Sequence, residues 1–368
     1  PRAAWRSTDD GEGRPGLGDG SLDETELWRA VRHLPAVQTA LDRMWPLLSP
    51  EELLHDLYGA PALLRLAGRG LMSEEEQATL HRPRSTSLDA IPWTAADLAL
   101  LDEARLLLGP RRAAAGEDDD VRAYGHIVVD EAQDLSPMQL RMLARRSLSG
   151  SMTVVGDIAQ ATGQRAPATW DEVTAHLPNR HPPRISELTV NYRTPGEIMD
   201  LAARVLAVTA PHLQPPRSVR TTGAGPVVTA ASPAELSTTV ARVVAGDVGD
   251  AAVGTVAVVA PPSLTAAVGG ALSGAGIPFG DAAHNALESR VSLVPPSMVK
   301  GLEFDVVVVV EPAAIVAESS QGLRALYVAL TRATRRLTVL HAEALPEPLL
   351  AAPPSPRAEG EALGRLGG

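Results

Sequence analysis

The feature that most constrains the fold is a short apolar run that ends abruptly in two adjacent carboxylates. Residues 126–134 read His-Ile-Val-Val-Asp-Glu-Ala-Gln-Asp, so Asp130 and Glu131 directly follow a β-branched run. Buried strands of parallel sheets read as such runs, and ligands bind at their carboxyl ends. Asp130 is therefore expected where a Mg²⁺ ion bridges nucleotide phosphates, and Glu131 where a side chain orients or deprotonates a water molecule.

The phosphate-gripping half of such a site is absent from the sequence. A G-x-x-x-x-G-K-[ST] loop, whose backbone cradles nucleotide phosphates, occurs nowhere in the 368 residues. The only lysine is Lys300, which lies in a different context. The sequence thus predicts the acidic half of an ATP site without the loop that holds the phosphates.

Four further segments follow the carboxylate pair in order. They span residues 152–160, 188–193, 299–310 and 326–334, and the last continues through two arginines into a strand at 337–340. An isolated Asp-Glu pair is most often a solvated strand end, but five ordered segments remove that interpretation. Their order, spacing and chemistry resemble motifs II to VI of the UvrD/Rep-type superfamily 1 helicases.

Two upstream segments narrow this resemblance. Residues 51–64 and 93–103 resemble the HelD family of actinobacteria, whose members act on RNA polymerase. The similarity is to the carboxyl-terminal half of such a protein, and a first residue Pro1 rather than Met agrees with a truncated chain. Abundant Ala, Arg, Gly and Pro also fit a GC-rich actinobacterial genome.

The resemblance implies a role in ATP hydrolysis for each motif residue. Asp130 is the expected Mg²⁺ ligand, and Glu131 is expected to activate the attacking water. Gln160 is expected to sense the γ-phosphate, with Asp157 supporting its loop. Arg332 is the expected arginine finger, which suits phosphate oxygens because the guanidinium is planar.

The resemblance also implies a nucleotide-binding group. Tyr192 is expected to stack on adenine, and Arg193 to reach the γ-phosphate. Glu303, which follows Gly301, is expected to bind the ribose. Taken alone, Tyr192 could equally be a core aromatic and Glu303 could pair with a neighbouring arginine.

The sequence departs from translocating helicases where those proteins contact DNA. Residues 161–170 contain one aromatic, Trp170, where the helicases carry a ring-rich segment that stacks on bases. Trp170 lies inside an expected helix, which favours core packing. Pro295 and Ser297 replace the T-x-H positions that contact the strand backbone. This pattern favours a motor or switch that works on a protein.

Composition limits the partners. The formal net charge is −11, whereas free-standing DNA-binding modules usually show a basic face. Nucleic-acid binding by this segment is therefore expected to be weak, and docking on a basic protein surface is favoured. The absence of cysteine fits a cytoplasmic protein. No apolar run reaches the roughly 18–20 residues of a membrane span, and the nine histidines form no metal-ligand spacing.

Hydrophobic periodicity and the resemblance together predict an α/β chain with an amino-terminal helical segment. It comprises two RecA-like, P-loop NTPase-type parallel-sheet units, of which the first is incomplete. The expected parts are flexible residues 1–24, a helical segment 25–110 from an inserted domain, the later half of the first RecA-like domain at 121–208, the second RecA-like domain at 223–345, and a disordered tail 346–368.

Individual elements can also be placed. Ser49 and Thr94 are expected helix caps, since each lies just upstream of a helical pattern. Strands are expected at 126–129, 152–156, 185–190, 226–230, 254–259, 291–294, 305–310 and 336–340. Helices are expected at 136–148, 168–176, 195–207, 233–246, 262–274 and 320–331.

The resemblance implies a HelD-like ATPase that uses ATP and Mg²⁺ to remodel or recycle RNA polymerase. This segment alone is expected not to hydrolyse ATP, because the phosphate loop is absent. One alternative is a UvrD/Rep-type DNA helicase of repair, against which the missing stacking segment argues. Another is an interaction fragment that never hydrolyses ATP, against which the acidic and arginine motifs argue.

Overall fold

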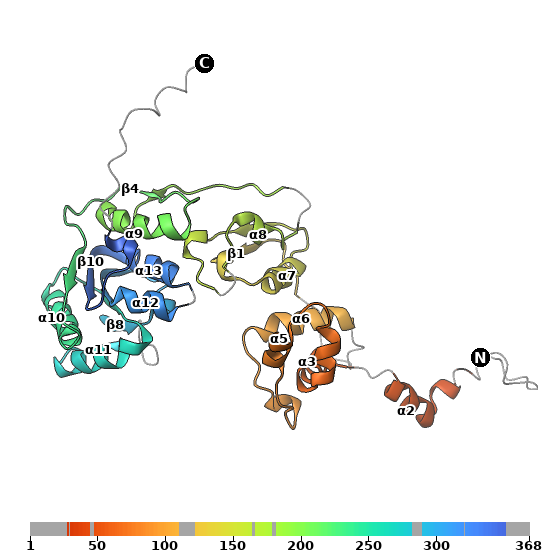
Figure 1. Cartoon of the computed structure of the whole chain (residues 1–368). Helices are drawn as coiled ribbons and strands as arrows, with labels where there is room; N and C mark the ends of the chain where they lie inside the picture. Colours follow the sequence, from red (N-terminus) through yellow and green to blue (C-terminus); the bar gives the residue numbers. More distant parts are fainter. Residues whose placement is uncertain are drawn as a thin grey trace, which may run out of the picture. The chain divides into compact units, whose positions relative to one another are not determined.

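The computed structural model describes residues 28, 30–44, 48–109, 122–163, 166–178, 182–281, 289–319 and 321–350. Its contacts divide the chain into two compact units, Pro1–Asp119 and Asp120–Gly368. We call the described part of the first the helical unit, and that of the second the α/β unit (Figure 1). The predicted flexible segment 1–24 and most of the predicted tail, 351–368, lie outside the described residues.

The helical unit is built as its periodicity predicts. Its elements are α2 (Pro35–Met44), α3 (Pro50–Gly59), α4 (Pro61–Ala67), α5 (Glu74–Leu80), the 3-10 turn η1 (Leu88–Ala90) and α6 (Asp97–Leu108). Leu54, Tyr58, Leu64 and Ala104, from α3, α4 and α6, form a small buried core. A small core gives a small free energy of unfolding, so a single polar contact can contribute a large fraction of this unit's stability.

The two predicted helix caps have different outcomes. Ser49 caps α3 as predicted: its Oγ accepts the Glu52 N–H at 3.0 Å, and the Glu52 carboxylate accepts the Ser49 N–H at 2.6 Å. This capping box satisfies two N–H groups that a helix start otherwise leaves unpaired. The predicted cap at Thr94 is wrong, because the carboxylate of Asp97 takes both polar hydrogens of Thr94 and α6 begins at Asp97.

The α/β unit alternates strands and helices. Up to residue 218 it contains β1 (Ile127–Val129), η2 (Ala132–Asp134), α7 (Pro137–Arg145), β2 (Met152–Val154), η3 (Ile158–Gln160), α8 (Trp170–Thr174), β3 (Val190–Asn191), α9 (Gly196–Thr209) and β4 (Arg217–Ser218). It continues with β5 (Val227–Ala230), α10 (Leu236–Gly249), β6 (Val256–Val259), α11 (Pro262–Gly274), β7 (Gly280–Asp281), β8 (Val291–Val294), η4 (Pro296–Met298), β9 (Phe304–Val310), α12 (Pro312–Glu318), α13 (Gly322–Leu330), β10 (Ala333–His341) and α14 (Glu347–Leu350).

Six of these strands form one sheet, which we call the large sheet. Its order is β5-β10-β9-β6-β8-β7, and every pairing is parallel. Residues 306–310 of β9 are five fully buried valines, as expected for a strand covered on both faces. Helices α9, α12 and α13 pack on one face, and α10 and α11 on the other (Figure 1). The predicted parallel α/β fold is confirmed.

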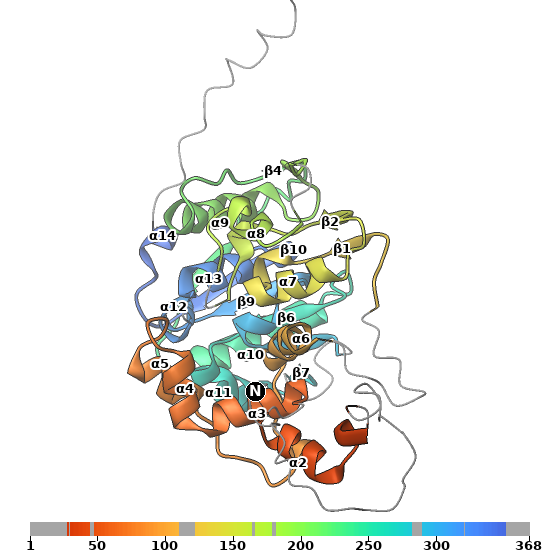
Figure 2. The same ribbon diagram turned by 90° about the vertical axis from the view of Figure 1, so that its right-hand side faces the viewer.

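Two strands, β1 and β2, form a separate parallel pair that we call the small sheet. Helices α7 and α8 lie beside this pair (Figure 2). The core contains Val129 of β1, Leu140 of α7 and Val173 of α8, with the partly buried Trp170 packed against them. Trp170 therefore packs against the core, as its position in a helix predicted.

Helix α9 packs differently from the prediction. We predicted a helix at 195–207 within the first RecA-like domain. In the structure, Ile198 and Val205 of this helix share a core with Val307 and Val309 of the large sheet. Helical periodicity reveals that a helix has an apolar stripe, but not which sheet that stripe covers. The loop that precedes α9 therefore lies beside the large sheet.

Two further differences concern short elements. The strand predicted at 185–190 is reduced to β3, which pairs with β4 over only two residues, and residues 182–189 are exposed coil. The tail predicted to be disordered from residue 346 begins with α14, because Leu349 packs into the core beside α9. No described helix has the length and apolarity needed to cross a membrane.

Candidate functional site

The carboxylate pair lies at the carboxyl end of β1, as predicted. Asp130 is exposed and accepts the Glu131 N–H at 2.8 Å. Glu131 has a left-handed backbone with φ of 50°. Such a conformation costs a residue other than glycine about 1–3 kcal/mol and concentrates at functional positions.

A second glutamate in the chain offers a comparison. Glu311, which follows β9, also has φ of 50°. Within the part of the chain that the structure describes, Glu131 and Glu311 are the two residues other than glycine with positive φ. The Glu311 carboxylate is buried and accepts the N–H groups of Ala342 and Glu343, so it holds the backbone after β10. The Glu131 side chain is 43% exposed. Its carboxylate thus remains available to a ligand or water.

Gln133 joins the ends of the two small-sheet strands, a role that its sequence context does not reveal. Its side chain is almost fully buried. Its Nε2 donates to Glu131 Oε2 at 2.5 Å, and its Oε1 accepts the Asp157 N–H at 3.0 Å. The available signal was Gly156, where a Cβ atom would lie 2.1 Å from Gln133 Oε1. Only glycine admits this close approach.

Asp157 organises the loop after β2. Its Oδ1 accepts the Ala159 N–H at 2.9 Å, and its Oδ2 accepts Gln160 Nε2 at 2.7 Å. The amide nitrogen of Gln160 is thereby fixed, and its Oε1 points to Arg332 Nη2 at 2.9 Å. The predicted support of Gln160 by Asp157 therefore has a direct geometric basis.

Arg332 lies between α13 and β10 and is only 4% exposed. Its Nε donates to the Val328 carbonyl at 3.1 Å, and Nη1 to the Leu302 carbonyl at 3.4 Å. Burial, followed by the charge of Arg193, lowers the pKa of Arg332. Arginine nevertheless stays charged. Since Arg332 is shielded from water, its positive charge strongly attracts an anionic oxygen placed beside Gln160.

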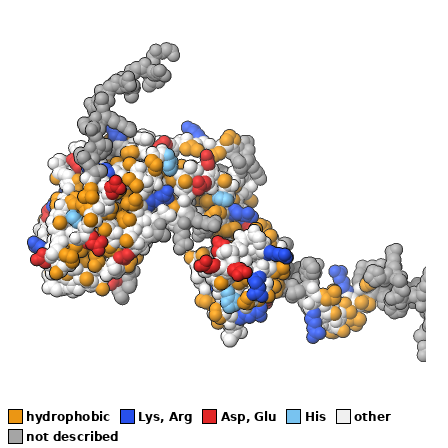
Figure 3. Space-filling view, viewed as in Figure 1, with side chains coloured by type: hydrophobic (Ala, Val, Ile, Leu, Met, Phe, Trp, Pro, Cys, Tyr) orange, Lys and Arg blue, Asp and Glu red, His pale blue; other side chains and the backbone are white. Residues whose placement is uncertain are grey.

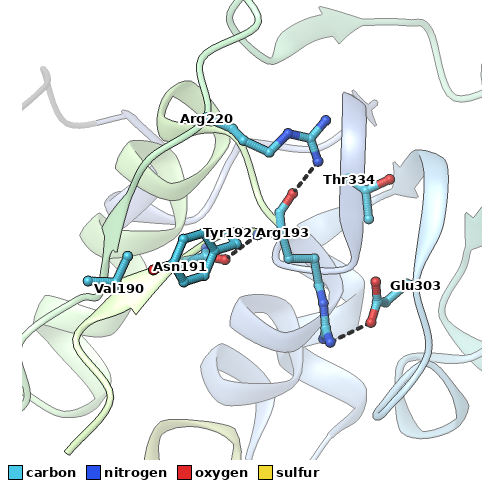
Figure 4. A pocket seen from close by; sticks show the side chains of 7 residues that line it. All are labelled: Val190, Asn191, Tyr192, Arg193, Arg220, Glu303 and Thr334. Atoms are coloured by element: carbon cyan, nitrogen blue, oxygen red, sulfur yellow. Dashed lines mark hydrogen bonds and ion pairs between the residues drawn. The ribbon is translucent and has the colours of Figure 1, made fainter.

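Tyr192, Arg193 and Glu303 line one open pocket of about 540 Å³, a volume typical of ligand sites. Arg193 Nη2 lies 2.5 Å from Glu303 Oε1, and Arg220 donates to the Arg193 carbonyl at 3.0 Å (Figure 4). Tyr192 is 71% exposed, so it is not a core aromatic. The lining residues are Val190, Asn191, Tyr192, Arg193, Arg220, Glu303 and Thr334.

Gly301 lies at the carboxylate group rather than in the pocket. Its φ is 73°, and a Cβ atom there would lie 3.9 Å from Glu131 Oε1. Glycine therefore suits both the backbone and the space beside that oxygen. The structure thus brings Glu131, Asp157, Gln160, Gly301 and Arg332 together.

The predicted metal ligand remains a single carboxylate. Among the described residues no group of three or more His, Asp or Glu side chains is placed to hold a metal ion. Magnesium in nucleotide sites is commonly held by one or two carboxylates together with phosphates and water. Asp130, exposed at the strand end, fits that arrangement, and the bound ion would neutralise phosphate charge.

Comparison with known proteins finds one family model that is similar to a short part of the chain. Residues 298–340 match the UvrD-like helicase C-terminal domain, and this range contains Glu303 and Arg332. The match supports a superfamily 1 helicase-type function, which confirms the resemblance at that level. The narrower HelD assignment stays a prediction. No curated protein matches the chain.

Similar solved structures include three helicases. The C-terminal domain of a possible DNA helicase from Lactobacillus plantarum shares 22% identity over 44% of this chain and 92% of its own, with a TM-score of 0.34. The PRRSV helicase shares 17% identity over 58% of this chain and 34% of its own, with a TM-score of 0.31. Arterivirus nonstructural protein 10 (helicase), in complex with DNA, shares 18% identity over 60% of this chain and 41% of its own, with a TM-score of 0.32. This chain thus spans less than half of either viral chain.

Proposed function

We propose that these residues form the carboxyl-terminal part of a HelD-like superfamily 1 ATPase that remodels or recycles RNA polymerase. In this proposal ATP binds with Mg²⁺, Asp130 contributes to Mg²⁺ binding, and Glu131 orients the attacking water. An upstream region of the full-length protein supplies the phosphate loop.

The observation that carries the ATPase part is the hydrogen bond between Gln160 and Arg332. Gln160 follows a strand of the small sheet, and Arg332 precedes a strand of the large sheet, 172 residues later. The desolvated guanidinium of Arg332 donates to the neutral amide oxygen of Gln160, so a phosphate oxygen that replaces this amide oxygen finds a positioned cationic donor. Phosphoryl transfer depends mainly on such positioning and charge neutralisation.

A protein partner is proposed because of the negative net charge of the chain and the lack of aromatic side chains that could stack on bases. The chain has a net charge of −11, and the described α/β unit shows scattered Lys and Arg side chains on the face drawn in Figure 3. Phosphate contacts by basic side chains supply most non-specific nucleic-acid affinity. Trp170, the one aromatic in residues 161–170, packs against the core of the small sheet. These features favour a protein partner.

The test uses the full-length protein and purified actinobacterial RNA polymerase that holds a fluorescent nucleic-acid scaffold. We expect ATP-dependent release of the scaffold, and we expect Glu131→Gln to bind the polymerase without repeated release. Deletion of residues 21–108 is expected to abolish polymerase binding while ATP turnover persists.

Other outcomes lead to the two alternatives. Nanomolar binding to single-stranded DNA, with strand displacement in the absence of polymerase, would instead support the UvrD/Rep-type repair helicase. Polymerase binding without any ATP turnover by the full-length protein would support an interaction module. In both cases the proposed remodelling ATPase is wrong.

A further inference from the structure

Lys300 occupies a position that its sequence context does not reveal. It lies between η4 and β9 of the large sheet, and its side chain is only 12% exposed. It is also the only lysine, because every other Lys-or-Arg position in the 368 residues is arginine. In a chain that uses arginine so consistently, one largely buried lysine indicates a site where the compact ammonium is needed.

The ammonium lies near three oxygens in the loops that follow the small-sheet strands, two of them at hydrogen-bond distance and one at ion-pair distance. Lys300 Nζ lies 2.5 Å from Asp134 Oδ2, donates to the Gln160 carbonyl at 2.6 Å, and lies 3.7 Å from Glu131 Oε2. Lysine has three rotatable donors on one nitrogen, whereas arginine presents a rigid planar fork. Three convergent oxygens therefore match lysine and do not match arginine.

These contacts leave one oxygen of Glu131 open. Gln133 and Lys300 both approach Oε2. Among the described residues no hydrogen bond reaches Oε1, and Gly301 places no side chain beside it. One carboxylate oxygen is thus contacted while the other accepts no hydrogen bond from the described residues, in a side chain that is 43% exposed. A base that orients water needs such an open acceptor.

Lys300 and Arg332 hold Gln160 in complementary ways. Lys300 binds its backbone carbonyl, and Arg332 binds its side-chain oxygen. Both cations lie in the loops that precede β9 and β10 of the large sheet, whereas Gln160, Glu131 and Asp134 follow the strands of the small sheet. The position of the small-sheet loops is therefore tied to the large sheet through these two side chains.

We propose that Lys300 is a positioning residue for hydrolysis, which fixes the Glu131 carboxylate and the Gln160 peptide relative to the large sheet. This inference rests on the ATPase proposed above. Lys300 itself does not touch the reacting atoms. It acts through Glu131 and Gln160, and a displacement of about 1 Å at such groups can cost roughly 10²-fold in rate.

The kinetic test uses the full-length protein with Lys300→Met and Lys300→Arg. We expect both variants to lower kcat by about 10–100-fold and to leave KM for ATP within about twofold, because the nucleotide is bound by other groups. Arg324→Met is the matched control. Arg324 Nη1 donates to the neighbouring Ala161 carbonyl at 3.2 Å, so its loss removes a similar backbone contact and is expected to leave kcat unchanged.

A second variant approaches the same contact from its partner. Asp134→Asn keeps Lys300 in place but removes the charge nearest to it. We expect a lower kcat here too. In the Glu131→Gln background, Lys300→Met is expected to cause no further loss, because residues that act as one unit are not additive.

The single lysine also permits a measurement without turnover. In the 368-residue chain, acetylation of Lys300 by acetic anhydride can be followed by mass spectrometry against the amino-terminal amine. We expect slow modification in the wild type and at least tenfold faster modification in Asp134→Asn. Equal rates in the two proteins would show that the ammonium is not held as described.

The outcomes separate this inference from the proposed function. If Glu131→Gln abolishes ATP turnover while Lys300→Met retains wild-type kcat, Lys300 is not a positioning residue and the ATPase proposal stands. If Lys300→Met is less stable but Asp134→Asn leaves kcat unchanged, the contact is purely structural. If the wild-type full-length protein shows no turnover, the ATPase proposal and this inference both fail.

Discussion

Replacing Asp97 by asparagine should weaken the helical unit selectively and in a pH-dependent way. The Asp97 carboxylate is 1% exposed and receives Arg82 Nη1 and Nη2, each at 2.9 Å. The backbone N–H and hydroxyl of Thr94 both donate to its Oδ2 at 2.8 Å. The Arg82 guanidinium also lies 4.7 Å from the centre of the Tyr58 ring. The ion pair therefore connects the start of α6 to α3 and the segment after α5.

The magnitude follows from the carboxyl group's pKa. The hydrogen bond from Arg82 is the largest cause that lowers the pKa of Asp97, which falls from 3.8 to about 2 although burial opposes the change. A tenfold change in proton affinity corresponds to about 1.4 kcal/mol, so the ionised group contributes about 2 kcal/mol to the free energy of unfolding.

The sign of the pH dependence follows from the same shift. Because the folded pKa lies below the unfolded one, the stabilisation is fully present above about pH 4 and is lost as the pH falls toward 2. Asparagine keeps the shape of the side chain but carries no charge. The free-energy difference between wild type and Asp97→Asn should thus be about 2 kcal/mol at pH 7 and distinctly smaller at pH 3.

Urea unfolding followed by hydrogen exchange in peptides from residues 50–108 reports on this unit within the whole chain. Asp89→Asn is the matched control, since Asp89 is exposed in η1 and its change should stay within about 0.5 kcal/mol. The reasoning is refuted if Asp97→Asn behaves like this control at pH 7. It is also refuted if the difference in unfolding free energy between Asp97→Asn and Asp89→Asn is the same at pH 7 and at pH 3.

Three further predictions concern the α/β unit. The 368-residue chain alone should neither hydrolyse ATP nor bind it tightly, because the phosphate loop is absent; Mg²⁺-dependent turnover above that of Glu131→Gln contradicts this. In the full-length protein Arg332→Ala should lower hydrolysis by roughly 10³–10⁵-fold with little effect on binding, and a change within about twofold excludes the finger role. Gly156→Ala should lower turnover, since the added Cβ meets Gln133; Gly163→Ala, where nothing lies within 4 Å, is its control, and equal rates would dismiss the role of Gln133.

Local pattern was sufficient for the buried strands and for the order of the motifs, but not for the exposed segment 185–190. The valine run of β9 and the apolar run before Asp130 define strands because a parallel strand is buried on both faces. Parallel strands also bring their carboxyl ends to one edge, which accounts for the proximity of Glu131 and Gln160. The structure has them joined through Gln133 and Asp157.

Long-range contacts between polar side chains were beyond the sequence. Lys300 contacts Asp134, 166 positions earlier, through a geometry that depends on how the two sheets pack. The same holds for α9, whose apolar stripe is clear but whose partner sheet is not. The sequence held two indirect signals. Gly156 is a glycine because a side chain there would clash with Gln133. The single lysine in an arginine-rich chain indicates a site that an arginine would not fit.

The contact between Gln160 and Arg332 explains how nucleotide could alter the relation of the two sheets. Gln160 Oε1 is a neutral acceptor for Arg332 Nη2, whereas a phosphate oxygen is negatively charged and adds Coulomb attraction to the hydrogen bond. A phosphate oxygen therefore competes favourably for the guanidinium. Lys300 meanwhile keeps the Gln160 backbone attached to the large sheet. ATP would thus exchange a side-chain contact while the backbone contact persists, so the sheets adjust without separating. Loss of Lys300 should then uncouple ATP binding from hydrolysis more than it weakens binding.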